Sequence, residues 1–174
     1  MSGGRMDATE LRALQAPLKD RYRADPDAAV AHVTARATFA DPGITATVDG
    51  SAGRIRAGLH PTTGGDGTDA CSADLLLQAL VACAGVTLRS VATAMGLDIR
   101  SAELVAEGVF DARGTLGISR EVPVGVMDVT VTAIVDTDAD DAELARLATG
   151  TERFCVVGQS LAETPEFVVV RGAR

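Results

Sequence analysis

The chain has 174 residues, 47% of them apolar and 3% aromatic, which suffices for one domain with a sizeable core and argues against a second domain. Its formal net charge of −8 argues against nucleic acid or an anionic membrane as a partner, because both bind basic surfaces. The N-terminus lacks the apolar stretch of a signal peptide. We therefore expect a cytoplasmic protein whose three cysteines are reduced.

The chain begins with a predicted N-terminal extension, residues 1–28, which a single domain over residues 29–174 follows. Leucines with charges between them occupy residues 8–16 and predict a short helix. It should end near Pro17, because proline lacks the amide hydrogen that an interior helical position uses. Apolar and polar residues then alternate in three stretches between proline and glycine turns, and these predict an antiparallel meander over residues 29–39, 44–48 and 54–59.

Residues 60–71 form a glycine-rich loop ahead of the next predicted element. Glycines before a helix can bind a phosphate group, but the lysine of a phosphate-binding loop is absent here. A flexible loop that lines a cleft or a partner surface is therefore the favoured interpretation.

A long helix follows this loop, and the rest of the chain is predicted to be organised around it. Ser72 and Asp74 are typical of a helix start, and Gly96 is typical of a helix end. Nearly every position over residues 75–88 is apolar, which predicts burial on all sides of the helix. A membrane span needs roughly 20 apolar residues. This run is shorter, so we expect a core helix.

The second half of the chain is predicted to contain one further helix and three strands, at residues 97–110, 126–135 and 166–171. The helix begins at the acidic residues 138–141, and Leu144, Leu147 and Ala148 form its predicted inner face. This order of elements indicates an α+β fold rather than alternating βαβ units.

The cysteines are the candidate reactive groups. Cys71, Cys83 and Cys155 contain no CxxC spacing, and with only two histidines in the chain a metal site is not expected. A cysteine in the middle of an apolar helix is often inert, and Cys83 would need a nearby cation to ionise. Cys155, near a predicted helix start and beside Arg153, is better placed for a stabilised thiolate. Cys71 would lie roughly 18 Å from Cys83 along a straight helix, too far for a disulfide within one subunit.

A resemblance to a known family rests on three segments, LLLQALVACAGVTL at 75–88, EGVFDARGTLG at 107–117 and TERFCVV at 151–157. They resemble the OsmC/Ohr family of thiol-dependent hydroperoxide reductases. The resemblance implies an α+β fold in which antiparallel sheets wrap around a long buried central helix. It also implies an intertwined homodimer, with two active sites at the dimer interface, and neither metal nor organic cofactor.

The resemblance also implies chemical roles for two cysteines. Cys83 would attack an organic hydroperoxide as the thiolate, and Cys155 would resolve the product to a disulfide that a dithiol reductant then opens. The implied function is a cysteine-based peroxidase in oxidative-stress defence. Two alternatives stay open, namely a binding protein of the same fold for a small apolar ligand, and a thiol–disulfide exchange or sensor protein.

One family residue is missing from the sequence. The peroxidases of the family carry a glutamate at the start of the long helix, where it orients a catalytic arginine, and Ala73 stands there in this chain. The arginine candidates are Arg36, Arg54 and Arg56. We favour Arg56 as the thiolate-stabilising residue because it lies just before the loop at His60, and His60 is the candidate substrate contact.

Overall fold

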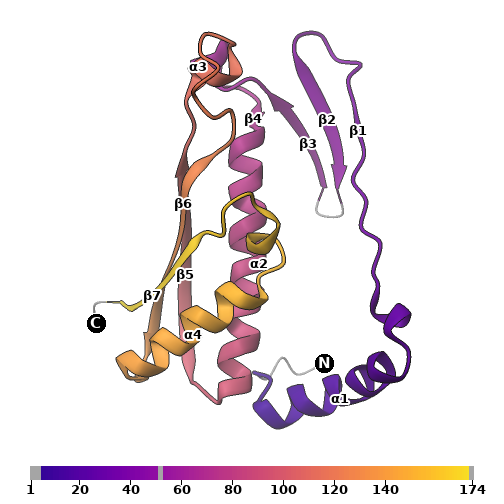
Figure 1. The fold of residues 1–174 in the computed structure, drawn as a ribbon, viewed down its shortest axis with the longest axis vertical. Helices are drawn as coiled ribbons and strands as arrows, with labels where there is room; N and C mark the ends of the chain where they lie inside the picture. Colours follow the sequence, from indigo (N-terminus) through magenta and orange to yellow (C-terminus); the bar gives the residue numbers. More distant parts are fainter. Residues whose placement is uncertain (1–4, 51–52, 173–174) are drawn as a thin grey trace.

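The computed structural model describes residues 5–50 and 53–172 of the chain (Figure 1). Residues 1–4 of the predicted extension and residues 51–52 of the predicted turn before the third strand lie outside the described residues. The long helix α2 (Ser72–Met95) runs through the middle of the structure. It separates a three-stranded sheet from a four-stranded sheet at residues 37–71, which we call the hairpin sheet and most of which stands away from the helix (Figure 1).

The end of α2 is confirmed, and its start differs by one residue from the prediction. Gly96 follows the helix with a φ of 73°, a left-handed conformation that glycine adopts without the steric cost of a Cβ. At the other end Cys71, and not Ser72, is the N-cap, and its side chain makes no capping hydrogen bond. The acidic residue expected in the first turn, Asp74, is present there.

Burial along α2 is confined to one stripe. Four residues at a spacing of four are buried, namely Leu80, Ala84, Leu88 and Ala92. Val86, on another side of the helix, is 74% exposed. The prediction that α2 is buried on all sides is therefore wrong for a single chain. By length and composition alone α2 could also cross a membrane, but a core helix passes the same test, so this is weak evidence.

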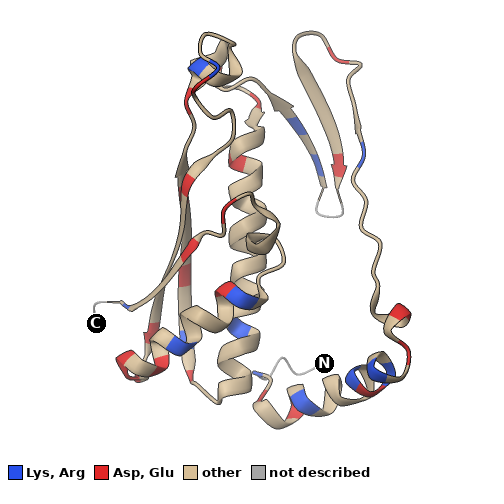
Figure 2. Ribbon diagram, viewed as in Figure 1, with Lys and Arg blue, Asp and Glu red and all other residues tan. Residues whose placement is uncertain are grey.

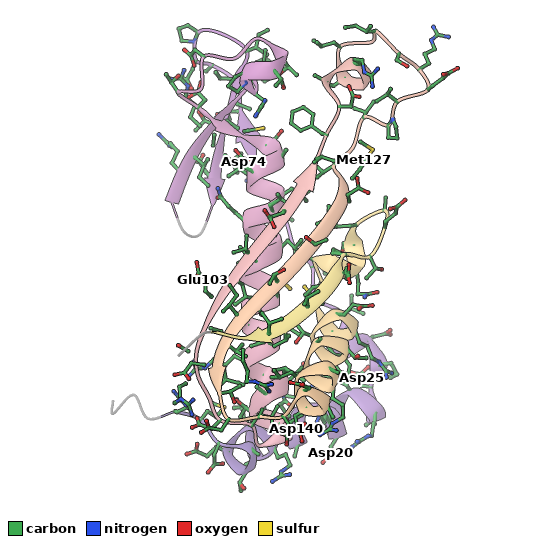
Figure 3. The ribbon with its side chains drawn as sticks, turned by 90° about the vertical axis from the view of Figure 1, so that its left-hand side faces the viewer. Asp20, Asp25, Asp74, Glu103, Met127 and Asp140 are labelled. Atoms are coloured by element: carbon green, nitrogen blue, oxygen red, sulfur yellow. The ribbon has the colours of Figure 1, made fainter. Side chains whose placement is uncertain are left out.

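The three-stranded sheet covers the buried stripe of α2, and its strand order is β5 (Ile99–Val109), β6 (Met127–Thr137) and β7 (Glu166–Arg171). Figure 3 shows this sheet lying across one side of α2. Strand β5 is antiparallel to β6, and β6 is parallel to β7. Between β5 and β6 the chain makes the short helix α3 (Ala112–Thr115).

The helix α4 (Asp141–Phe154) connects the parallel strands β6 and β7 as a single βαβ unit, which the sequence did not predict. The other helices do not alternate with parallel strands in this way, so the predicted α+β fold class is confirmed. Its start is confirmed as acidic, because Asp140 accepts a hydrogen bond from the Glu143 amide and Glu143 accepts one from the Asp140 amide. Leu144 and Leu147 are buried against α2 and the sheet, as predicted for the inner face.

The second sheet has the strand order β1 (Ala37–Thr38), β2 (Thr45–Gly50), β3 (Gly53–Gly58) and β4 (Ala70–Cys71). The antiparallel meander is confirmed for β1, β2 and β3, and β4 adds a parallel strand beside β3. The predicted first strand over residues 29–39 is largely wrong, because all but two of these residues lie outside the sheet. The 3₁₀ helix η1 (Pro26–Ala29) precedes the extended residues 30–36.

The N-terminal helix α1 (Ala8–Ala24) is longer than predicted and passes through Pro17. Its start is fixed by a capping box between Asp7 and Glu10. Proline at this position removes a hydrogen bond to the Ala13 carbonyl. Ala13 and Pro17 are both exposed, so water can satisfy that carbonyl and the helix continues.

Candidate active site

The fold brings the side chains of Cys83 and Cys155 into direct contact. Cys83 projects from the middle of α2, and Cys155 is the C-cap of α4. The two thiol groups are hydrogen-bonded to one another. Cys155 is fully buried and Cys83 is half-buried, so the pair has one inner and one outer sulfur. They lie in a cluster of buried apolar residues formed by Leu80, Ala84, Val131 and Phe167.

Hydrogen-bond donors from two elements converge on the Cys83 sulfur. Burial raises the pKa of the Cys83 thiol and is the largest single effect. Four hydrogen bonds oppose it, from the Val157 amide, the Cys155 thiol, the Thr87 hydroxyl and the Val156 amide. Together they hold the pKa of Cys83 below that of an ordinary thiol. Within the described residues of one chain, the groups that lower the pKa of Cys83 are these hydrogen-bond donors, and no cation is among them.

The position of Val156 and Val157 explains how a cysteine in mid-helix obtains this support. The chain leaves α4 at Cys155 and turns toward the short 3₁₀ helix η3 (Gly158–Ser160), which packs against α2. The two amides in this turn face the Cys83 sulfur. An amide N–H stabilises an anion in the way that an anion-binding nest does.

Cys155 has the opposite electrostatic environment. Burial raises the pKa of its thiol most, the Gly158 amide lowers it through a hydrogen bond to Sγ at 3.4 Å, and the neighbouring Cys83 raises it again. The net pKa is raised. The prediction that Cys155 is the better placed thiolate is therefore wrong, because Cys155 ends α4 instead of starting a helix. Arg153 lies over the Phe154 ring, 5.4 Å from its centre.

These two shifts make the pair chemically unequal. The outer sulfur of Cys83 ionises first, and the inner sulfur of Cys155 keeps its proton to a higher pH. A thiolate is the nucleophilic form of cysteine. The arrangement suits a reaction in which Cys83 attacks first and Cys155 acts second.

The other predicted site residues lie elsewhere in the single chain. Arg56 makes a two-pronged ion pair with Asp69, with Nε 3.0 Å from Oδ1 and Nη2 3.1 Å from Oδ2. This pair lies beside the start of α2, since Ala57 of β3 pairs with Ala70 of β4. Cys83 is eleven residues into the helix, roughly 16 Å further along its axis. One chain therefore does not bring Arg56 to Cys83.

His60 belongs to the same distant end of α2. Its Nδ1 accepts a hydrogen bond from the Thr62 amide at 3.1 Å, and its ring packs edge-on against Phe110 with centres 5.2 Å apart. Through this ring contact His60, which precedes η2 (Pro61–Thr63), packs against the residue that follows the end of β5. The remaining arginine candidates also lie on the hairpin sheet or before it, where Arg54 pairs with Asp49 at 2.9 Å.

The structure adds site residues that sequence reasoning missed. Thr87 follows Cys83 by one helical turn, a spacing that could have indicated it. The Val156 and Val157 amides carry no sequence signal, because every residue except proline offers the same group. Cys71 is buried at the start of α2. Within residues 5–50 and 53–172, no group of three histidine, cysteine or acidic side chains could hold a metal ion.

The sequence profile of the family described as OsmC-like protein matches residues 65–170, which is more than half of the chain. The chain belongs to the OsmC-like family. This membership confirms the resemblance that the three sequence segments carried. A search of curated proteins found no match.

Solved structures of OsmC-like proteins share the fold at low sequence identity. An organic hydroperoxide resistance protein from Elizabethkingia anophelis is 14% identical, with a TM-score of 0.65 over 83% of this chain and 98% of that one. The OsmC-like protein of Mycoplasma pneumoniae is 13% identical, with a TM-score of 0.63 over 82% and 98%. The organic hydroperoxide resistance protein OhrB of Bacillus subtilis is 20% identical, with a TM-score of 0.52 over 82% and 100%. At these identities the likeness shows the fold alone.

Proposed function

We propose that this OsmC-like chain is a cysteine-based peroxidase that reduces organic hydroperoxides with a dithiol reductant, in oxidative-stress defence in the cytoplasm. The observation that carries the proposal is the contact between Cys83 and Cys155, with the pKa of Cys83 lowered and that of Cys155 raised. Peroxide reduction needs a thiolate together with a second thiol that prevents further oxidation. Organic hydroperoxide resistance proteins among the solved structures of this fold add support.

The reaction would proceed in three balanced steps. The Cys83 thiolate attacks one peroxide oxygen, the O–O bond breaks, and the leaving alkoxide takes a proton to become an alcohol while Cys83 becomes a sulfenic acid. The Cys155 sulfur then attacks the Cys83 sulfur, and hydroxide leaves with the Cys155 proton as water. An external dithiol finally reduces the disulfide and is itself oxidised to a disulfide.

The apolar surroundings of the pair favour an alkyl hydroperoxide over a charged substrate. Leu80, Val131 and Phe167 surround the sulfurs on the inner side. On the outer side Phe154 is 60% and Val156 72% exposed, so an alkyl chain could pack there. A charged substrate would gain nothing from these side chains.

We propose a homodimer as the working form. The uncovered sides of α2 support it, and so do exposed apolar residues of the turn between β1 and β2, namely Phe39 at 87% and Ile44 at 74% exposure. A second copy that covers α2 with its hairpin would bury both surfaces. Figure 2 shows that the middle of α2 carries no charged residue, so any cation near Cys83 must come from another segment.

In such a dimer Arg56 of the partner subunit is the candidate cation for the Cys83 thiolate. Asp69 would orient that arginine. In the family's peroxidases a glutamate has this role, and Ala73 stands at its position in this chain. The two-pronged pair with Arg56 supports this assignment, because such a pair fixes the plane of the guanidinium. Asp69 is only 14% exposed, which holds the acid in place.

The deciding experiment follows the loss of an alkyl hydroperoxide and of hydrogen peroxide in the presence of a dithiol. Wild-type protein should consume the alkyl hydroperoxide faster. Cys83→Ser should abolish turnover, and Cys155→Ser should stop after one oxidation. Cys71→Ser is the matched control and should keep full activity. Absence of turnover in the wild-type protein would refute the peroxidase and favour a ligand-binding role.

A second candidate is thiol–disulfide exchange without peroxidase turnover. It is favoured by one observation: the groups that act on the Cys83 thiol in the described part of the chain are amides, a hydroxyl and a thiol, with no cation among them. This candidate predicts that oxidised glutathione forms the Cys83–Cys155 disulfide as fast as an alkyl hydroperoxide does. The peroxidase predicts a much faster reaction with the hydroperoxide.

A further inference from the structure

Helix α1 carries an apolar stripe that its own chain covers only at one end. Four residues spaced three or four positions apart lie on one face of the helix, namely Leu11, Leu14, Leu18 and Tyr22. Leu11 is buried where α1 meets α2, whereas Leu14, Leu18 and Tyr22 are exposed. The exposed part of the stripe, from Leu14 to Tyr22, is roughly 12 Å long. The apolar face of α1 is therefore longer than the surface that its own chain offers it.

The start of α1 is fixed, so the exposed stripe has a defined place in the structure. Arg5 forms an ion pair with Asp98, which lies between α2 and β5, and donates a hydrogen bond to the Arg100 carbonyl at 3.1 Å. Figure 1 shows α1 and the hairpin sheet on the side of α2 that faces away from the three-stranded sheet. The extended residues that join them carry Val30 and Val33, which are exposed as well. The stripe thus extends the apolar surface on the uncovered side of α2.

Unpaired cations lie beside this stripe. Helix α1 holds four basic and two acidic residues, whereas the chain as a whole has 16 basic and 24 acidic residues. Arg23 pairs with Asp20 at 2.7 Å, but Arg12, Lys19 and Arg21 have no ion-pair partner among the described residues. At about 100° per residue, Lys19 and Arg21 lie on opposite sides of the stripe. A surface that covers the stripe should therefore be apolar at its centre and acidic at its edges.

We propose that α1 docks on a second copy of this chain and forms part of the interface between the two copies. A second copy fits the stripe in both respects, because the middle of its α2 is apolar and uncharged and its net charge of −8 is opposite in sign to that of α1. An anionic membrane also attracts basic amphipathic helices, but the acidic remainder of the chain opposes such binding. The inference rests on the proposed homodimer and adds the N-terminal helix to its contact surface.

The test measures the dimer dissociation constant of the full-length protein by sedimentation equilibrium. A double variant with Leu14→Glu and Leu18→Glu places two carboxylates on the stripe. It should raise the dissociation constant about a hundredfold, because a two-fold interface contains each substitution twice. The matched control has Ala13→Glu and Ala16→Glu, two exposed positions on the opposite face of α1. It adds the same charge to the same helix and should change the constant by less than about threefold.

A cross-link identifies the surface that α1 contacts. The photoreactive residue benzoylphenylalanine replaces Leu18, and copies labelled with ¹⁵N are mixed with unlabelled copies. We expect cross-linked peptides that join one labelled and one unlabelled chain, and this result also decides the question if the Leu14→Glu and Leu18→Glu variant loses its circular dichroism signal.

Three results would overturn the inference. The first is a dimer that both double variants weaken equally or not at all, and the second is a cross-link found only within single chains. The third is a wild-type protein that stays monomeric, or whose α1 binds phosphatidylglycerol vesicles instead of a second copy. Because no measurement here follows peroxide, a dimer without peroxidase turnover can still pass these tests, and an active peroxidase can still fail them.

Discussion

The contact between α4 and α2 can be tested at one glycine, because α4 holds Cys155 against Cys83. A Cβ added at Gly150 would lie 2.8 Å from Cγ1 of Val91 on α2, roughly 1 Å inside a normal carbon–carbon contact. Alanine is favoured over glycine inside a helix by about 1 kcal/mol. Overpacking costs about 1–3 kcal/mol, and the χ1 angle of a helical valine is too restricted to relieve it. Gly150→Ala should therefore lower the free energy of unfolding by about 1 kcal/mol.

Removal of the Val91 methyl groups should reverse the effect of Gly150→Ala on the free energy of unfolding. In a Val91→Ala background the clash is gone, so Gly150→Ala should raise the free energy of unfolding by about 1 kcal/mol. Urea unfolding, monitored by circular dichroism, gives the free energy of unfolding of the wild type, the two single mutants and the double mutant. All four are measured at one protein concentration, because association changes apparent stability. If Gly150→Ala were stabilising to the same extent in both backgrounds, α4 would not pack on α2 as described.

Three further outcomes follow from the site. At pH 7 iodoacetamide should label Cys83 before Cys155, because the pKa of the Cys83 thiol is lowered by its hydrogen bonds and that of the Cys155 thiol is raised by burial, so Cys83 has the larger thiolate fraction. Peptide mass spectrometry that found the reverse order would contradict this. Leu80→Ala should cost about 2–5 kcal/mol in urea unfolding, since Leu80 is fully buried beside the sulfurs; a cost below about 1 kcal/mol would mean that the cluster is loose. Asp69→Asn should slow peroxide reduction, because Asp69 is proposed to orient Arg56 of the partner subunit. In protein diluted to the monomer, the pH dependence of Cys83 alkylation should not change. Equal rates of peroxide reduction in mutant and wild type would show that Asp69 has no role in the reaction.

Much of the fold could be predicted because strong local signals agreed with the tertiary structure. Gly96 ends α2 as expected, since glycine tolerates a left-handed conformation. The strand predicted at residues 166–171 matches β7 at both ends. The acidic start of α4 is confirmed by the capping box of Asp140 with Glu143. In each case a few neighbouring residues determine the structure.

The failures lie where the answer depends on distant parts of the molecule. Alternating residues at 29–39 predicted a strand, but a strand also needs a partner, and most of this stretch has none within the described residues. Pro17 predicted a helix end, yet solvent exposure makes its lost hydrogen bond cheap. An all-round apolar α2 predicted complete burial, which one chain does not provide.

The candidate site was predicted in part. The sequence alone indicated Cys83 and Cys155 as a pair only through the family resemblance, since no local rule links residues so far apart. Their relative acidity was predicted in the wrong order, because it depends on where α4 ends. Residues 156–157 turn toward α2, and their two amides lie against the Cys83 sulfur. That arrangement is a property of the folded backbone and has no residue signature.

The proposed chemistry requires that the Cys83 and Cys155 sulfurs lie side by side, with Cys83 the more reactive. The most direct measurement treats the reduced protein with one equivalent of an alkyl hydroperoxide, digests it under denaturing conditions that block free thiols, and identifies the linked peptides by mass spectrometry. We expect a disulfide between the peptides of Cys83 and Cys155 within one chain, with Cys71 still free. Recovery of Cys83 as an unlinked sulfinic acid, or a disulfide that involves Cys71 instead, would contradict it.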